Sequence, residues 1–431
     1  MFINLIEQLI NGLRTGSIYA LIALGYTMVY GIAKMINFAH GDIIMVGAYT
    51  LYVAVSLFNL PIWAAIIITI TVCSFLGIIV EKIAYKPLRK APALAVLITA
   101  IGVSYLLQSL SLIIFNATPI PFKSVIPNPN IKIGAVTISG ISLITLIVTA
   151  ISMTILSYFI NKTKMGSAMR AVSEDKDAAG LMGIDVNKTI SLTFAIGSAL
   201  AAVAGILYMA QYETLKPTMG ALPGIKAFVA AVLGGIGSIP GAMLGGILLG
   251  IIESLSKAYI STELADAIVF GVLVIVLLAK PTGLLGRQKQ VKVYDKMKKI
   301  VNLKNIIKLI AVIAIYILIL TLLNGDILSR QYKSLVIPIT VNIILAVSLN
   351  LVTGFLGELS LGHAGFMSIG AYTGALISTY SKLPPLPTII IAMLAGSTIA
   401  AVFGFLIGVP VLRLRGDYLA IVTLAFGEII K

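Results

Sequence analysis

The chain has few charged residues, one cysteine, one tryptophan and two histidines. Only 11% of its 431 residues are charged, whereas 59% are hydrophobic, and a soluble domain carries roughly 25% charged residues. Its mean hydropathy is +1.06. These values exclude an ordinary soluble domain and indicate a multi-span membrane protein. The single cysteine, Cys73, lies in an apolar run and has no partner for an intrachain disulfide.

Several chemical motifs are also missing. The chain has no G-x-x-x-x-G-K-[ST] loop, so it has no nucleotide site of its own. No nucleophile, acid–base pair or metal-ligand cluster is evident, and we therefore predict no catalytic residues, no metal, no cofactor and no enzymatic activity. The N-terminus lacks a basic region and a cleavage site, so no cleaved signal peptide is expected. Net charge is +15, but the basic residues cluster in short loops, which favours anionic lipid over nucleic acid as their partner.

Apolar runs long enough to cross a bilayer as helices recur along the whole chain. They fall near residues 14–33, 41–58, 61–80, 93–115, 139–160, 190–210, 264–280, 306–323, 334–353, 364–380 and 386–409. Residues 1–13 place apolar side chains on one helical face and predict a short helix lying in the membrane interface. The predicted fold class is therefore an all-α, polytopic helical protein of the plasma or inner membrane.

Loop charges set the orientation of these spans. The loops at 81–90, 161–190 and 287–308 are rich in Lys and Arg and should be cytoplasmic, whereas the loop at 116–138 should lie outside. An even number of crossings, or none, must then lie between residue 210 and the span at 264–280.

The apolar stretch at 225–254 can satisfy this requirement for an even number of crossings, or none. We interpret it as two half-helices that turn back, or as two short tilted spans, and a hairpin that serves only packing fits as well. The break consists of Gly234, Gly235, Gly237, Pro240 and Gly241.

One phrase of the sequence occurs twice. Residues 37–50 and 360–373 align at a constant offset, which pairs His40 with His363 and Gly31 with Gly354. The spans that precede the two copies run in the same direction, so the repeats are parallel and related by an axis along the membrane normal.

The repeat predicts two tandem membrane modules. Residues 1–293 form a complete module of about eight membrane segments, including the broken hairpin. Residues 294–431 form a second, truncated module of about four spans and a partial one, because the last apolar run, from Asp417 to Lys431, is too short to span comfortably.

The repeated phrase supplies candidates for a pathway or inner gate. They are Asn37, His40, Gly41, Ser360 and His363. Alternatively, each imidazole fixes a sharp turn through backbone hydrogen bonds, since an ionisable residue in a membrane is only a default hypothesis of function. Asp42 could pair with His40. No buried proton-relay carboxylate is evident, and Glu253 is expected at the interface.

The loop at 161–190 contains a short, well-capped helix. Ser173 is the predicted N-cap, and Glu174, Asp175 and Asp177 place negative charge in the first turn, where it complements the helix dipole. Gly183 is a natural C-terminal stop. A solvated connector is the alternative interpretation.

The motif Asp177-Ala178-Ala179-x-x-x-Gly183 resembles the Glu-Ala-Ala-x-x-x-Gly loop of ABC importer permeases, with Asp in place of Glu. In that family the helix docks into a groove of the ATPase subunit. The resemblance therefore implies an ATPase-coupling loop formed by Glu174, Asp177, Ala178, Ala179 and Gly183.

Longer stretches resemble the permeases of branched-chain amino-acid ABC importers. Residues 1–293 resemble one permease subunit and residues from about 297 resemble the other, of which about half is covered. The stretches that carry the resemblance are Tyr19–Gly31, Ile36–Gly41, Ala230–Gly241, Ser360–Phe366 and Leu414–Leu424.

The resemblance implies partners and a cargo. Two separate ATPase subunits would bind ATP, an extracytoplasmic amino-acid-binding protein would deliver leucine, isoleucine or valine, and a second permease subunit or a homodimer would complete the assembly. The alternatives are a related ABC permease for urea, short amides or sugars, an ion-coupled secondary transporter, and an inactive truncated fusion.

Overall fold

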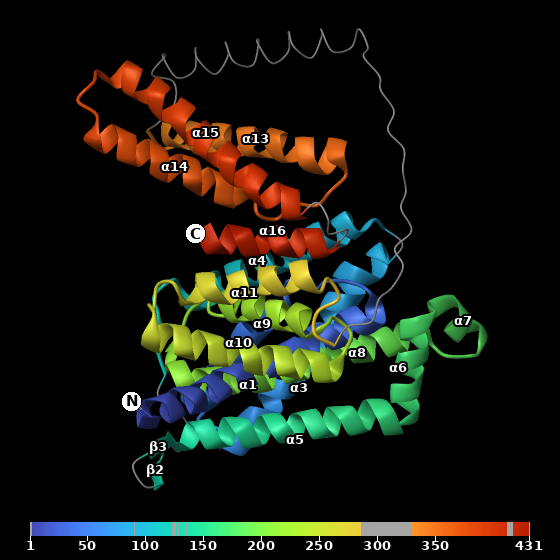
Figure 1. Cartoon of the computed structure of the whole chain (residues 1–431). Helices are drawn as coiled ribbons and strands as arrows, with labels where there is room; N and C mark the ends of the chain where they lie inside the picture. The colour runs from blue at the N-terminus through green and yellow to red at the C-terminus, as the bar shows by residue number, and fades with distance from the viewer. Residues whose placement is uncertain are drawn as a thin grey trace.

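The protein is described by a computed structural model. It describes residues 2–89, 91–122, 126, 129–133, 136–285, 330–411 and 417–430. Long helices lying side by side dominate it (Figure 1). Nine helices within the described residues are long and apolar enough to cross a membrane, which confirms the predicted polytopic all-α class.

Residues 2–285, the first part of the chain, form most of the packed helices. Their bounds are α1 (Phe2–Ala33), α2 (His40–Tyr52), α3 (Ile62–Val80), α4 (Ala93–Phe115), α5 (Gly140–Lys162), α6 (Lys164–Glu174), α7 (Lys176–Leu181), α8 (Val186–Tyr212), α9 (Ala221–Gly234), α10 (Ile239–Tyr259) and α11 (Ala265–Ala279). Short π- and 3-10-helical turns extend α2 and α3: η1 (Val53–Leu57), η2 (Glu81–Tyr85) and η3 (Lys86–Leu88).

Helix α1 corrects one prediction. Residues 2–33 form a single continuous helix, and the candidate span covers Ile3–Ala33, so there is no separate interfacial helix at 1–13. The reason is close packing along α10: the backbones of Gly16 and Gly250 meet, and Gly12 meets Ile251. The helix therefore packs against α10 from Gly12 onward, whereas Ile3 and Leu5 of its first turns stay exposed.

Two small antiparallel sheets are built from the loops at the outer end. Strand β1 (Ile120–Pro121) pairs with β4 (Thr214–Leu215), and β2 (Asn130–Ile133) pairs with β3 (Val136–Ser139). Figure 1 places β2 and β3 at one end of the helices and α7 at the other, as the charge argument requires.

The glycine-rich break separates α9 from α10. Helix α9 has 14 residues and α10 has 21, so α10 is a full-length candidate span and not a half-helix. The chain turns through Gly235 and Gly237, with φ of 106° and 91°. After α11, the amides of Leu284 and Leu285 donate to the carbonyls of Leu233 and Gly234 (2.8 and 2.9 Å). The break and the end of α11 thus lie together, as two crossings between α8 and α11 require.

Residues 330–430, the second part of the chain, form fewer helices. They are α13 (Arg330–Asn350), η4 (Leu351–Leu356), α14 (His363–Tyr380), α15 (Pro385–Val411) and α16 (Asp417–Ile430). Helix α16 lies against α11 (Figure 1), and Ile421 and Val422 are buried in the same apolar core as Phe270 of α11. The predicted span at 306–323 and the basic stretch at 287–308 lie outside the described residues.

Candidate functional site

Helix α7 is a single, firmly capped turn at the cytoplasmic end. Asp175 is its N-cap: the Asp175 Oδ1 atom accepts from the amides of Asp177 (2.9 Å) and Ala178 (3.0 Å). The prediction of Ser173 as the N-cap is wrong. Ser173 still lies inside α6, where its hydroxyl donates to the carbonyl of Arg170 (2.7 Å), whereas Asp175 has the extended backbone that an N-cap requires.

The C-terminus of α7 is closed equally well. Gly183 has φ of +84°, its amide donates to Gly180, and the next amide, of Ile184, donates to Ala179 (3.0 and 3.1 Å). These two bonds form a Schellman motif, which requires a left-handed residue at the position of Gly183. The predicted stop at Gly183 is confirmed.

The exposed face of α7 is apolar at its tip. Ala178 is exposed, but Ala179 is buried beneath the helix. Leu181 and Met182 are 89% and 83% exposed. Both are large apolar residues, and they lie outside the membrane-spanning helices, where lipid would not cover them. The sequence prediction missed this pair. The sequence did offer a signal for it, because two large apolar residues directly precede the glycine that ends the helix. Glu174 and Asp177 are also exposed.

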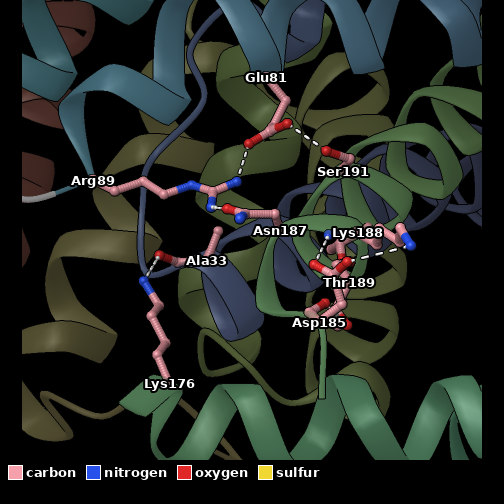
Figure 2. Close-up of polar contacts among 10 residues, drawn as sticks. Ala33, Glu81, Arg89, Lys176, Asp185, Asn187, Lys188, Thr189 and Ser191 are labelled. Atoms are coloured by element: carbon pink, nitrogen blue, oxygen red, sulfur yellow. Dashed lines mark hydrogen bonds and ion pairs between the residues drawn. The ribbon is translucent and has the colours of Figure 1, made fainter. Parts of the chain in front are cut away.

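A buried polar network lies where α3 meets α8 (Figure 2). Glu81 and Arg89 form an ion pair, and the second Glu81 oxygen accepts from the hydroxyl of Ser191 (2.6 Å). Arg89 also donates to Asn187 (2.5 Å). Because Glu81 is fully buried, its charge must be paired in this way. From the sequence, Glu81 and Arg89 were only charges of the loop at 81–90, and Asn187 and Ser191 were not identified.

Two further contacts fix the loop to the helices. Lys176, the first residue of α7, donates from Nζ to the carbonyl of Ala33 (2.7 Å), the last residue of α1 (Figure 2). Burial, and then the nearby Arg89 charge, lower the pKa of Lys176. Asp185 caps α8 by accepting from the amide of Lys188 (3.0 Å), and this bond holds the pKa of Asp185 below its usual value.

The first copy of the repeated phrase forms the turn between α1 and α2. His40 begins α2, is 1% exposed and meets the ring of Tyr26 edge-on at 4.7 Å. The predicted pairing of His40 with Asp42 is wrong: the Asp42 carboxylate accepts from Gln108 Nε2 (2.9 Å). Asn37 Oδ1 accepts from the hydroxyl of Tyr85 (2.8 Å).

The second copy also places its histidine at the start of a helix, but the π-helical segment η4 precedes its turn. His363 begins α14, and its Nε2 shares a hydrogen bond of 2.6 Å with the hydroxyl of Ser348 on α13. Ser348 stands where the first copy has Gly25. Each histidine thus contacts the helix before it in its own part of the chain. Their role in a pathway or inner gate stays a prediction.

Replacing Gly25 by alanine should destabilise the first part of the chain. A Cβ atom at Gly25 would lie 2.3 Å from His40 Nε2, so the buried ring would have to move, at a cost of about 1–3 kcal/mol. The measurement is thermal unfolding in detergent. Gly102→Ala is the matched control, because no atom lies within 4 Å of its Cβ position, and alanine is the better helix former. Equal melting temperatures for the two variants would contradict the assigned contact.

Of the predicted gate and hairpin residues, Asn37 alone lines a small hollow, which also borders the break through Ile236. The other lining residues are Tyr26, Tyr30, Ile36, Phe228 and Ala231. Gly41 packs against the backbone of Gly220 at the start of α9, and Gly234 packs against Gly241 across the break. Pro240 lies in the first turn of α10, and Ser360 is half-buried before α14.

Buried carboxylates inside the spans correct another expectation. Asp42 and Glu253 are 1% and 2% exposed, so buried carboxylates are present that the sequence did not indicate. Glu253 binds Lys226 (3.0 Å), Lys257 (2.6 Å) and the hydroxyl of Tyr19 (2.8 Å). Lys226 also binds Asp266 (2.6 Å), so α1, α9, α10 and α11 are joined by charge. Among the described residues, no group of three or more His, Cys, Asp or Glu could hold a metal ion.

Comparisons with known proteins match both parts of the chain. Residues 8–277 and 332–431 match the family described as the permease component of the branched-chain amino acid transport system. The high-affinity branched-chain amino acid permease BraD of Pseudomonas aeruginosa is 44% identical over 300 residues, which are 67% of this chain and 98% of that protein. LivH of Escherichia coli K12 is 43% identical over 305 residues (68% and 99%).

A second relative accounts for a shorter stretch. LivM of Escherichia coli K12, also a branched-chain amino acid permease, is 56% identical over 89 residues, or 21% of this chain and 20% of that protein. A LivH-like part is therefore joined to a LivM-like part. No solved structure gives a significant match. The chain belongs to the family of permease components of branched-chain amino acid transport systems.

Proposed function

We propose that this chain is a permease of an ATP-driven importer that carries leucine, isoleucine and valine across the inner membrane. The observation that carries the proposal is α7: a rigidly capped cytoplasmic helix that exposes Leu181 and Met182. Exposed apolar residues on an otherwise polar loop are typical of a docking surface. The family of the chain supplies the class of cargo.

The proposal requires partners. Two ABC ATPase subunits bind ATP at the cytoplasmic side, and an extracytoplasmic amino-acid-binding protein delivers the cargo. A second permease subunit or a second copy of this chain completes the path. Residues 1–293 and 294–431 act as the two modules of the chain, and no cofactor is needed besides the ATP held by the partners.

In the proposed mechanism, ATP binding brings the ATPases together and displaces α7, which turns an inward-facing path outward. Asn37 and His40 with Gly41, and Ser360 and His363 in the second copy, line or support its inner gate. The hairpin break supports the same region, because Ile236 and Asn37 line one hollow. An apolar path discriminates weakly, since one methylene is worth about 1–3 kcal/mol, so the binding protein supplies selectivity.

The test is uptake of labelled leucine by cells with and without this gene. We expect uptake to disappear with the gene and to be competed by unlabelled isoleucine and valine but not by urea or ribose, because the cargo is a branched-chain amino acid. Deletion of the ATPase genes should abolish the same uptake.

Other outcomes identify the rival functions. Competition by urea or ribose instead of isoleucine would assign the chain to a different cargo. Uptake that survives loss of the ATPases and collapses with the ion gradient would assign it to ion-coupled transport. Leucine uptake that is unchanged by deletion of the gene would contradict the proposal.

A further inference from the structure

The link between Lys176 and Ala33 joins the cytoplasmic loop to the inner end of α1. The ammonium group of the first residue of α7 binds the carbonyl of the last residue of α1 at 2.7 Å. The last carbonyls of a helix lack intrahelical partners and carry partial negative charge. A bond from a charged donor to such a carbonyl is stronger and more directional than an apolar contact.

The apolar contact between the same elements is incomplete. Met169 and Val172 of α6 are buried, but an open cleft remains between α6 and α1. Its lining includes Thr27, Met28 and Ile32 from α1 and Met169, Arg170 and Ser173 from α6. Apolar contact is non-directional, and a cleft can narrow without moving its far wall. A displacement of α6 and α7 could therefore be absorbed there, whereas the Lys176 bond would transmit it.

The receiving end of this bond is the turn that carries the repeated phrase. The chain leaves α1 through Lys34, whose φ is 58°, and reaches Asn37 and His40 within seven residues of Ala33. The Tyr85 hydroxyl holds Asn37, and Tyr85 lies on η2 with Glu81, whose partner is Ser191 on α8. Movement at Ala33 would thus reach the ends of α1, α2, α3 and α8 through polar contacts.

We propose that Lys176 is the positioning residue that converts movement of α7 into movement of the α1–α2 turn. This inference rests on the proposed function, since it assumes that a partner ATPase moves α7. It assigns Lys176 to transmission and not to docking: its ammonium group points back to α1 (Figure 2), whereas Leu181 and Met182 at the other end of α7 are exposed.

The experiment compares Lys176→Met, Lys176→Arg and Lys188→Met in the full permease–ATPase complex, reconstituted in liposomes. Lys188→Met is the control, because the Lys188 side chain is 84% exposed and pairs only within its own loop, with Asp185. We expect Lys176→Met to retain ATPase co-purification and ATP hydrolysis. The amount of leucine transported per ATP hydrolysed should fall about tenfold. Lys176→Arg should restore most of the transport, because it keeps a charged donor.

A second measurement does not depend on the cargo. Nucleotide-dependent amide hydrogen exchange is followed in residues 34–40 and 176–183 of the same complexes. In the wild type, ATP should change exchange in both segments, and in Lys176→Met the change should persist at 176–183 but disappear at 34–40. A merely structural role would instead alter exchange at 34–40 with and without nucleotide.

Three results would overturn the inference: no nucleotide-dependent change at 34–40 in the wild type, the same change in Lys176→Met, or loss of ATPase co-purification in that variant. Failure of the wild-type complex to transport leucine would overturn the proposed function instead. The exchange measurement would still decide the role of Lys176.

Discussion

Replacing Leu181 and Met182 together by aspartate is expected to abolish co-purification of the ATPase subunits. The two side chains are almost fully exposed at the tip of α7, so a partner that covers them gains about 1.5–3 kcal/mol for each. Loss of both contributions corresponds to a roughly hundredfold to ten-thousandfold weaker complex, and the two buried carboxylates would weaken it further. The measurement is affinity capture of the ATPases from detergent-solubilised membranes.

The control for this variant is Met165→Asp, an exposed position in α6 of the same loop. It should capture the ATPases normally, and both variants should insert into the membrane and melt like the wild type. Ala179 is a poor target for the same test, because it is buried and its replacement would disturb α7 itself. Normal capture by the double variant would show that the tip of α7 is not the docking surface.

Replacing Glu253 by alanine is expected to lower the free energy of unfolding by about 3–5 kcal/mol. The change leaves the nearly buried Lys226 with only Asp266 and removes the acceptor of the Tyr19 hydroxyl and the partner of Lys257. The ammonium groups of Lys226 and Lys257 are then balanced only by the Asp266 carboxylate, and this excess of buried positive charge accounts for the size of the effect. The melting temperature in detergent should fall by roughly 10 °C or more.

Two further variants separate charge from packing. Glu263→Ala, at an exposed position between α10 and α11, should change stability by at most about 0.5 kcal/mol. The double variant Lys226→Met, Glu253→Met removes both buried charges and should be less destabilised than Glu253→Ala. A double variant that melts as low as the single one would contradict the role assigned to the ion pair.

Sequence reasoning performed best where the signal was local. The spans that become α4 and α11 agree with the structure to within one residue, because apolar runs bounded by polar or proline residues define helices in a membrane. Gly183 was identified as a stop since a left-handed C-cap depends on one residue type. Ser173 and Asp175 are both good N-caps by composition, and only the backbone of α6 decided between them.

The sequence by itself determined that this is a helical membrane protein, that the His40 segment is repeated at His363, and that the loop at 161–190 holds a capped helix; it also predicted the orientation of the spans. These properties depend on hydropathy, loop charge and capping chemistry, all of which act over a few neighbouring residues. The tertiary structure alone decided that α1 is continuous, that Glu253 is buried with Lys226, and that Lys176 binds Ala33. The Glu253–Lys226 and Lys176–Ala33 contacts join residues far apart in the chain. Whether a charge is exposed or paired depends on which helices pack around it, and α1 is continuous because it packs along a neighbouring helix.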